Sequence, residues 1–521
     1  MRSSTFYFTE RRSAFAFSLG SALVALGALL HLPMYWMGRF NHFVLAGMPM
    51  DPAMYWGMAT ILVGVGVAAY GLLPKSEALS HTHDPVERLA PPEDAPLTRA
   101  HWTVMVVLTL ALVIDIMKPA SLGLVTPGMR AEYGLDGTMI TWFPFFALAG
   151  TVIGSFVWGA LADLYGRRAT ILLSSVMFVG TSICGTMPSF WWNVGMCFVM
   201  GVSAGGMLPV AYALLAEIMP TRHRGWALVL VGSIGAVGGY LAASGLSAVL
   251  QPIFGWRVMW LLNLPTGFII ISLAGSLPES ARFLQLKGRA AEARAVLARF
   301  GAVVAAAPAK LHDTSHSHLP PIERNHLGVT IALTLAALSW SMVNFGLLLW
   351  LPSGLGDEGF SVDVASAIIA KSSFIALPLM GLCAYLYSRW STKWSLTLMI
   401  GIMTLGLLTE LLRGAHIPAL SSPVVSTTAL IIGSTGAISM LLPYTAECYP
   451  LRIRGRASGW IAGCSKLGGL GAQGLAIFTG IPPLGIASLV MALPATTAIA
   501  LMARFGGETR GRDLRMLEAA E

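Results

Sequence analysis

AEIMPTRHRG, from Ala216 to Gly225, and AECYPLRIRG, from Ala446 to Gly455, are two copies of one ten-residue phrase. Both read Ala-Glu-x-x-Pro-x-Arg-x-Arg-Gly, and each follows a long apolar run and begins a short basic loop. Identical residues at identical spacing indicate that the two halves of the chain are related. A membrane protein built from two related halves is the plan of many secondary transporters.

The composition predicts a polytopic, all-α membrane protein. The 521 residues are 55% hydrophobic and only 11% charged, and the mean hydropathy is +0.70. A soluble protein of this length needs far more polar surface. Apolar stretches of about 20 residues predict about fourteen spans. They lie near 12–32, 53–73, 102–125, 138–160, 169–187, 193–216, 225–249, 257–277, 327–351, 364–387, 395–412, 424–446, 456–479 and 482–503.

The distribution of lysine and arginine predicts the orientation of the chain. Basic pairs fall in alternate short loops, at 167–168, 222–224 and 452–456, whereas a loop between them carries Asp357 and Glu358. Because cytoplasmic loops are rich in cations, both termini are expected in the cytoplasm and the protein in the cell (inner or plasma) membrane. The same bias explains the net charge of +8, so no nucleic-acid partner is expected.

Six segments follow from the composition. The first apolar run lacks a small-residue cleavage site and leads into a second span, so we expect an anchor helix rather than a removed signal peptide. The predicted segments are a two-helix preface (1–74), a cytoplasmic linker (75–101), an N-terminal six-helix bundle (102–277), a central cytoplasmic loop (278–326), a C-terminal six-helix bundle (327–504) and a cytoplasmic tail (505–521).

GALADLYGRR, from Gly159 to Arg168, stands between the second and third helices of the first bundle. Gly159 would permit close helix contact, and Asp163 can accept a hydrogen bond from a helix N-terminus. The stretch resembles the loop motif of the major facilitator superfamily. PESAR at 278–282 and ETRGR at 508–512 resemble motifs of its sugar-porter-like and synaptic-vesicle-protein-like branches. The resemblance covers about 102–515 and implies two pseudo-symmetric six-helix bundles, here with two helices added.

The resemblance also implies a cytoplasmic gate made of salt bridges. The alternative is that these charges only mark cytoplasmic loops. Two departures from the family pattern stand out: the second-half loop, YLYSRWSTKW, lacks the glycine and aspartate, and Cys197 occupies the place of an arginine found in many proton-coupled members. The implied gate residues are Asp163, Arg167, Arg168, Glu217, Arg224, Glu279, Arg282, Glu447, Arg454 and Glu508.

Asp115 and Lys118 lie near the middle of the first helix of the N-terminal bundle. Ionisable groups at membrane depth are costly and are functional candidates by default. Three residues apart, the two side chains share one helix face. Either they form a structural pair, or Asp115 exchanges a proton while Lys118 moves between Asp115 and the substrate.

Lys371 and Lys466 lie in the eighth and eleventh helices of the two bundles, without a same-helix carboxylate at helical spacing. Three lysines and one central aspartate predict a basic cavity that takes an anion. Alternatively, one or two lysines pair with Glu410 or with a cytoplasmic carboxylate. Several polar and aromatic residues could line the cavity, although a residue of each kind more often serves only in packing: Trp142, Tyr212, Trp340, Asn344, Tyr444 and Gln473. Phe345 lies at helical spacing from Trp340.

Several kinds of chemistry have no support in the sequence. The preface loop holds histidines and methionines from His31 to Met54, but methionine is used as a filler throughout, so no metal is expected. The five cysteines form no pair or metal spacing. Walker A, HExxH and CxxC motifs are absent, so we expect neither a cofactor nor an enzyme.

The sequence therefore predicts a monomeric secondary transporter that works by alternating access. We expect it to move a small organic anion, a carboxylate, together with protons across the bilayer. Three alternatives stay open: a sugar or polyol transporter, an exporter of apolar compounds, and a membrane sensor or assembly factor that does not transport.

Overall fold

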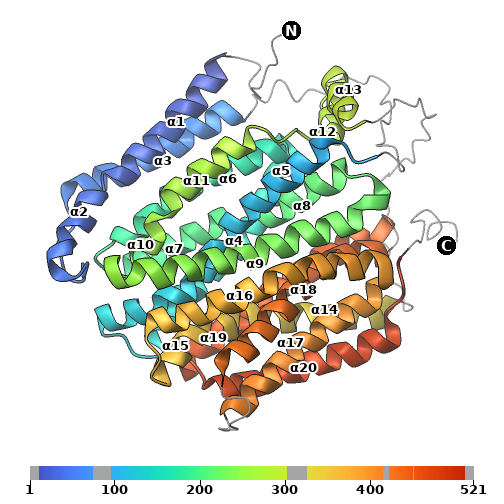
Figure 1. The fold of residues 1–521 in the computed structure, drawn as a ribbon. Coiled ribbons are helices and arrows are strands. Elements are labelled where there is room, and N and C mark those ends of the chain that lie inside the picture. The colour runs from blue at the N-terminus through green and yellow to red at the C-terminus, as the bar shows by residue number, and fades with distance from the viewer. Residues whose placement is uncertain (1–10, 74–95, 302–325, 415–421, 450, 511–521) are drawn as a thin grey trace. The chain divides into compact units, whose positions relative to one another are not determined.

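A computed structural model shows the chain as a set of long helices (Figure 1). It describes residues 11–73, 96–301, 326–414, 422–449 and 451–510, apart from the side chains of Thr221, Arg282, Leu286, Leu451, Arg452 and Arg454. Within these ranges every regular element is helical. The predicted all-α membrane fold is confirmed.

Twelve helices among the described residues are long and apolar enough to cross a membrane, and each coincides with a predicted span. The two other predicted spans correspond to the shorter apolar stretch Val258–Ala274 and to Leu451–Thr479, a helix that carries Lys466 and three arginines. The twelve are Arg11–Asn41, Pro52–Leu72, Arg99–Tyr133, Met139–Tyr165, Arg167–Thr186, Phe190–Ile218, Arg222–Phe254, Leu327–Asp357, Val362–Trp390, Thr392–Arg413, Pro423–Cys448 and Leu484–Phe505.

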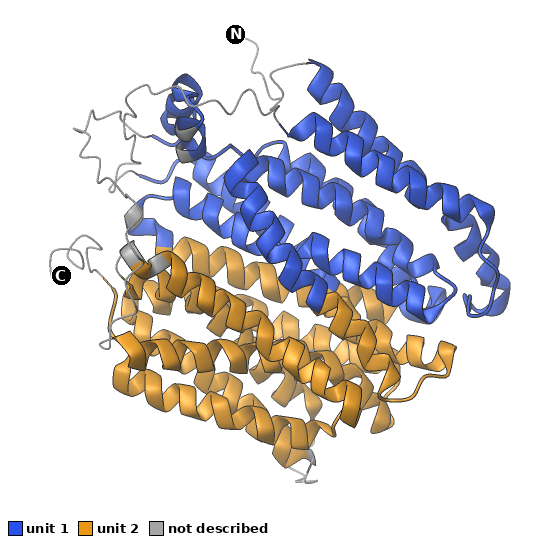
Figure 2. Cartoon of the chain, turned by 180° about the vertical axis from the view of Figure 1, so that it is seen from behind, with its two compact units in different colours: residues 1–118, 149–224, 250–311 blue, residues 119–148, 225–249, 312–521 orange. Residues whose placement is uncertain are grey.

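The contacts divide the chain into two compact units (Figure 2). Unit 1 comprises residues 1–118, 149–224 and 250–311, and unit 2 comprises 119–148, 225–249 and 312–521. This division cuts three long helices, whereas the predicted bundles follow chain order; the predicted bundle boundaries stay a prediction.

Unit 1 contains the preface and most of the first half. Its helices are α1 (Arg11–Leu29), α2 (Leu32–Met37), η1 (Gly38–Asn41), α3 (Pro52–Leu72), the start of α4 (Arg99–Tyr133), the end of α5 (Trp142–Tyr165), α6 (Arg167–Gly180), η4 (Thr181–Thr186), α7 (Phe190–Ala204), α8 (Met207–Ile218), both ends of α9 (Thr221–Phe254), α10 (Val258–Leu261), α11 (Asn263–Ala274), α12 (Ala281–Leu286) and α13 (Ala290–Arg299).

Unit 2 contains the rest of α4, α5 and α9 together with the second half. Its other helices are η3 (Met139–Thr141), α14 (Leu327–Met342), η6 (Val343–Leu347), α15 (Leu348–Asp357), α16 (Val362–Tyr385), η7 (Leu386–Trp390), α17 (Thr392–Gly414), α18 (Pro423–Cys448), α19 (Leu451–Thr479) and α20 (Leu484–Phe505).

The preface helices α1 and α3 lie side by side (Figure 1) because glycines let their backbones meet. A Cβ on Gly20 would lie 2.4 Å from the Ala68 nitrogen, and one on Gly27 would lie 2.6 Å from the Gly57 oxygen. The pair packs on α6, where Ile61 contacts the position of Gly180. The preface is therefore built into unit 1.

Unit 2 contains a π-helical turn, η6, between α14 and α15. The Gln473 side chain donates from Nε2 to the Phe345 carbonyl over 2.7 Å and accepts from Trp350 Nε1 over 3.2 Å. A π turn leaves helical carbonyls without regular partners, and such turns frequently mark functional sites. The fully buried Gln473 satisfies one of these carbonyls from α19.

Candidate functional site

Asp115 and Lys118 form a buried ion pair on α4 in unit 1. The Lys118 Nζ lies 3.3 Å from Asp115 Oδ1, and the two residues are 2% and 5% exposed. The ammonium also lies over the Phe178 ring, 3.2 Å from its centroid. The predicted pairing is confirmed, and Phe178 adds a cation–π contact that stabilises the charge away from water. No sequence pattern links Phe178 to Lys118, because the contact joins two helices.

A second cluster lies in unit 2, where Lys466 and Trp340 both contact the ring of Phe345. The Lys466 Nζ lies 5.3 Å from the centroid of the Phe345 ring. Trp340 meets the same ring edge-on at 5.5 Å. A half-buried ammonium beside aromatic walls can bind a flat anion such as an aromatic carboxylate.

Asn344 and Gln473 also join this part of unit 2. Tyr240, in α9, donates its hydroxyl to Asn344 Oδ1 over 3.0 Å. Gln473 holds η6, so its amide is occupied by the protein itself. Tyr240 was not predicted; it closes the glycine-rich run GSIGAVGGY, which is the one local signal for it.

The other predicted liners are placed differently. Tyr444 is fully buried and donates to the Gly507 carbonyl over 2.6 Å, which places it with the C-terminal segment. Trp142 stacks on Phe146 at 5.7 Å. Tyr212 is half-buried on α8, and Lys371 is exposed on α16. The substrate-binding roles of these residues stay predictions.

Among the described residues Glu410 pairs with no lysine, so that part of the alternative is wrong, while pairing of a lysine with a cytoplasmic carboxylate stays a prediction. Its carboxylate accepts from Arg413, with Nε at 3.2 Å, and from the Ser426 hydroxyl at 2.6 Å. Arg413 lies three residues further along α17, so the fully buried carboxylate finds its partner on its own helix.

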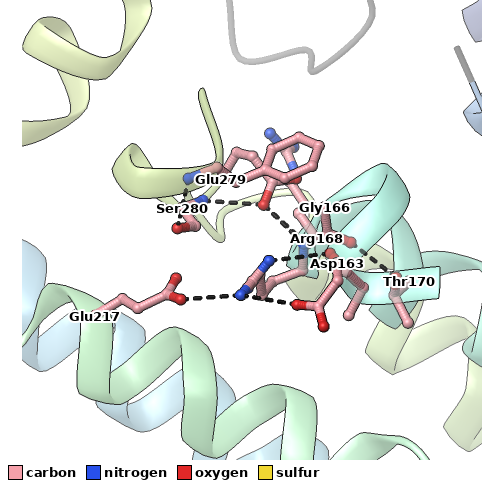
Figure 3. Close-up of polar contacts among 10 residues, drawn as sticks. Asp163, Gly166, Arg168, Thr170, Glu217, Glu279 and Ser280 are labelled. Atoms are coloured by element: carbon pink, nitrogen blue, oxygen red, sulfur yellow. Dashed lines mark hydrogen bonds and ion pairs between the residues drawn. The ribbon is translucent and has the colours of Figure 1, made fainter. Parts of the chain in front are cut away.

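Half of the predicted gate is an interconnected set of polar contacts in unit 1 (Figure 3). Arg167 Nη2 lies 3.2 Å from Asp163 and 3.1 Å from Glu217. Arg168 donates to the Gly275 carbonyl over 2.6 Å. Glu279 Oε1 accepts from the backbone nitrogens of Arg167 and Ser280 at 2.8 and 2.9 Å. The carboxylate therefore binds the N-terminus of α6, where backbone donors and the helix dipole favour a negative charge.

Gly166, the residue before α6, is required by this arrangement. Its φ of +102° is a conformation that residues with a side chain rarely adopt. A Cβ there would lie 2.5 Å from Glu279 Oε2. The expectation that Gly159 permits close helix contact is wrong, because nothing described lies within 4 Å of a Cβ at that position.

Unit 2 uses the same device. The Glu508 carboxylate accepts from the Thr392 nitrogen at 3.0 Å and from its hydroxyl at 2.6 Å, and it also binds the Ser391 hydroxyl. It therefore caps the N-terminus of α17 as Glu279 caps α6. Glu447 accepts from Tyr387 at 3.0 Å and Thr509 at 2.7 Å. The second-half loop has lost the glycine and aspartate of the motif but retains the capped helix.

Their surroundings shift the pKa values of the two capping carboxylates in opposite directions. Burial raises the pKa of Glu279 and outweighs its backbone hydrogen bonds. Burial also works to raise the pKa of Glu508, but the hydroxyls of Ser391 and Thr392 and two backbone nitrogens lower it to about 2.

Of the remaining predicted gate residues, Arg224 is half-buried at the start of α9. The side chains of Arg282 and Arg454 lie outside the described residues.

Comparisons with known proteins agree on one family. The model of the Major Facilitator Superfamily matches residues 107–473. The niacin transporter NiaP of Acinetobacter baylyi is 24% identical over 82% of this chain and 98% of its own length. The 4-hydroxybenzoate transporter PcaK of the same organism is 26% identical over 72% of this chain and 84% of its own length. A gallate transporter of Pseudomonas putida is 26% identical over 79% of this chain and 93% of its own length.

Solved structures agree on the fold. The proton:xylose symporter XylE, bound to 6-bromo-6-deoxy-D-glucose, matches with a TM-score of 0.62 and 17% identity, over 81% of this chain and 98% of that one. The inward-open form of XylE from E. coli matches with a TM-score of 0.61 and 16% identity, over 81% of this chain and 99% of that one. α1 and α3 lie outside the residues that the family model matches.

Proposed function

This chain belongs to the Major Facilitator Superfamily, and from that premise we propose that it moves a small aromatic carboxylate across the membrane in symport with a proton. Membership makes it a multi-pass membrane transporter rather than an enzyme, as the sequence predicts. The proposal extends to a monomer in the cytoplasmic membrane with both termini in the cytoplasm, because the basic loops alternate along the chain.

The observation that carries the proposal is the buried Asp115–Lys118 pair. Removing either charge leaves the other uncompensated at membrane depth, so a proton and a carboxylate can be exchanged there in a linked way. Protonation of Asp115 releases Lys118 from its partner. The freed ammonium then attracts an anion, so that proton and substrate move together.

The substrate class rests on the aromatic cluster and on the relatives. Niacin, 4-hydroxybenzoate and gallate, named for three of the relatives, each combine an aromatic ring with a carboxylate. Lys466 beside Phe345 and Trp340 offers a cation and aromatic faces to that combination. The likeness to XylE concerns the fold alone, so it does not carry a sugar substrate.

Uptake into proteoliposomes with an imposed proton gradient tests the proposal. Asp115→Asn is expected to lose uphill uptake of benzoate and 4-hydroxybenzoate but to keep exchange across the membrane. Lys466→Met is expected to weaken uptake of both by about tenfold or more, because it removes the charge that binds the carboxylate. Asp357→Asn and Lys287→Met, whose side chains lie outside both clusters, serve as matched controls. Unchanged accumulation by Asp115→Asn would remove this residue from the coupling role.

A further inference from the structure

The indole nitrogen of Trp340 is a hydrogen-bond donor with no partner in the described part of the chain. Trp340 is only 5% exposed on α14, and its Nε1 is buried with no acceptor among the described residues. By contrast, Trp158 Nε1 donates to the Val202 carbonyl over 2.7 Å, and Trp350 Nε1 donates to Gln473. Indole N–H groups donate only, and buried ones usually find an acceptor. An orphan donor beside a candidate binding cluster indicates a place for a ligand acceptor.

Trp340 and Lys466 lie at the same depth in unit 2. α14 and α19 run parallel, since Trp460 donates to Thr334 and, further along both helices, Gln473 reaches the Phe345 carbonyl. Between these contacts, a Cβ on Gly468 would lie 2.4 Å from the Leu338 oxygen. Residues 466 and 340 therefore flank one level of the helix pair, and both contact the single Phe345 ring.

We infer that Trp340 selects the substrate by donating its Nε1–H to an acceptor on the aromatic ring, while Lys466 binds the carboxylate. The inference rests on the proposed function and narrows it. The preferred substrates are aromatic carboxylates whose ring carries a phenolic oxygen or a ring nitrogen. Unsubstituted benzoate leaves the buried donor unpaired, and a site built to hydrogen-bond a substrate discriminates strongly against an analogue without that group.

Uptake of 4-hydroxybenzoate, nicotinate and benzoate by the full-length protein in proteoliposomes tests this selection. Trp340→Phe keeps an aromatic ring and removes the donor, so uptake of the two acceptor-bearing substrates should fall by about tenfold more than that of benzoate. Comparing 4-hydroxybenzoate with nicotinate shows whether the indole donates to a phenolic oxygen, to a ring nitrogen or to both. Trp350→Phe is the matched control: its nitrogen is already bonded inside the protein, so it should affect the three substrates equally.

A measurement on the unaltered protein keeps the test independent of how the variants fold. 4-Methylbenzoate has nearly the shape of 4-hydroxybenzoate but no acceptor, and it should compete about tenfold less well for uptake. Equal competition by the two compounds, or an unchanged substrate ratio in Trp340→Phe, overturns the inference while leaving aromatic carboxylate transport intact. Failure of the unaltered protein to take up any of the three compounds overturns the proposed function and the inference with it.

Discussion

At the scale of single residues, Gly166 connects backbone conformation to the contacts of the loop before α6. It turns the chain into α6 at a φ of +102°, and Glu279 lies where its side chain would be. The Glu279 oxygen cannot simply move away, because the other oxygen of the same carboxylate accepts backbone hydrogen bonds. Strain in the backbone and loss of the cap therefore act together at this position.

Gly166→Ala is expected to lower the free energy of unfolding by about 1–3 kcal/mol, the usual cost of a strained backbone conformation. Thermal unfolding in detergent, followed by tryptophan fluorescence, measures the loss. Gly159→Ala is the control, since no atom of the residues that the structure describes lies within 4 Å of a Cβ at that position. Equal stability of the two variants would show that the loop adapts to a side chain at 166.

The opposite pKa shifts of the two capping carboxylates predict opposite dependences of folded-state stability on pH. The pKa of Glu508 is lowered to about 2, so its charge stabilises the folded state above its ordinary pKa near 4.5, and this contribution is lost as the pH falls towards 2. The pKa of Glu279 is raised by burial, so ionising this carboxyl costs the folded state stability, and protonation at falling pH relieves that cost.

Glu508→Gln is therefore expected to lower the Tm at pH 7, by more than Glu279→Gln does. The Glu508→Gln deficit should shrink as the pH falls below 4.5, because the carboxyl of the unfolded chain then takes up a proton while the folded one, with its pKa of about 2, stays ionised. Tm values of both variants and the unaltered protein between pH 3 and 8 check the sign. A deficit that grows as the pH falls would contradict the assignment.

At the scale of elements, the preface is tied to the C-terminal end of α9. Tyr35 donates its hydroxyl to the Phe254 carbonyl over 2.8 Å, and Phe43 stacks on Tyr35 at 4.9 Å. The glycine-lined contact of α1 with α3 and their packing on α6 complete the attachment. These contacts are structural, and none of the residues proposed for transport belongs to the preface.

Removing residues 1–74 is expected to lower stability while leaving aromatic carboxylate uptake in place. The loss has a physical source, since α6 exposes the face around Gly180 and the Phe254 carbonyl loses its donor. Uptake per folded molecule and the Tm are the measurements. Tyr35→Phe provides a milder control that removes one hydrogen bond, at a cost of about 1 kcal/mol. Abolished uptake by a folded, truncated protein would instead favour the sensor or assembly-factor alternative.

At the scale of the whole molecule, alternating access requires that opposite ends of the helices face different compartments. From the alternation of basic loops we propose that the central loop, residues 278–326, lies in the cytoplasm. A cysteine introduced at Ser315 should react with a membrane-impermeant maleimide only after cells are opened. One introduced at Gly356, which is exposed near the end of α15 at the opposite end of the predicted span, should react in intact cells. The reverse pattern would invert the proposed orientation, and with it the side on which the gate lies.

The sequence determined the features that depend on local pattern and composition. Span positions follow from runs of apolar residues, and the Asp115–Lys118 pair follows from spacing on a single helix. The family follows from short motifs, which the match over residues 107–473 confirms. Each of these is written in consecutive residues, so no distant contact is needed to read it.

Only the tertiary structure decided which distant residues meet. Glu279 reaches α6 and Glu508 reaches α17 across more than a hundred residues of chain, and Lys466 finds Phe345 on another helix. The tertiary structure also places Tyr444 beside the C-terminal segment, and it leaves the Trp340 nitrogen without an acceptor among the described residues. The physical reason is that apolar periodicity fixes which face of a helix is buried, whereas the choice of partner depends on how whole helices pack. The duplicated phrase thus predicts the family, while the packing of α14 against α19 supports the proposed substrate class.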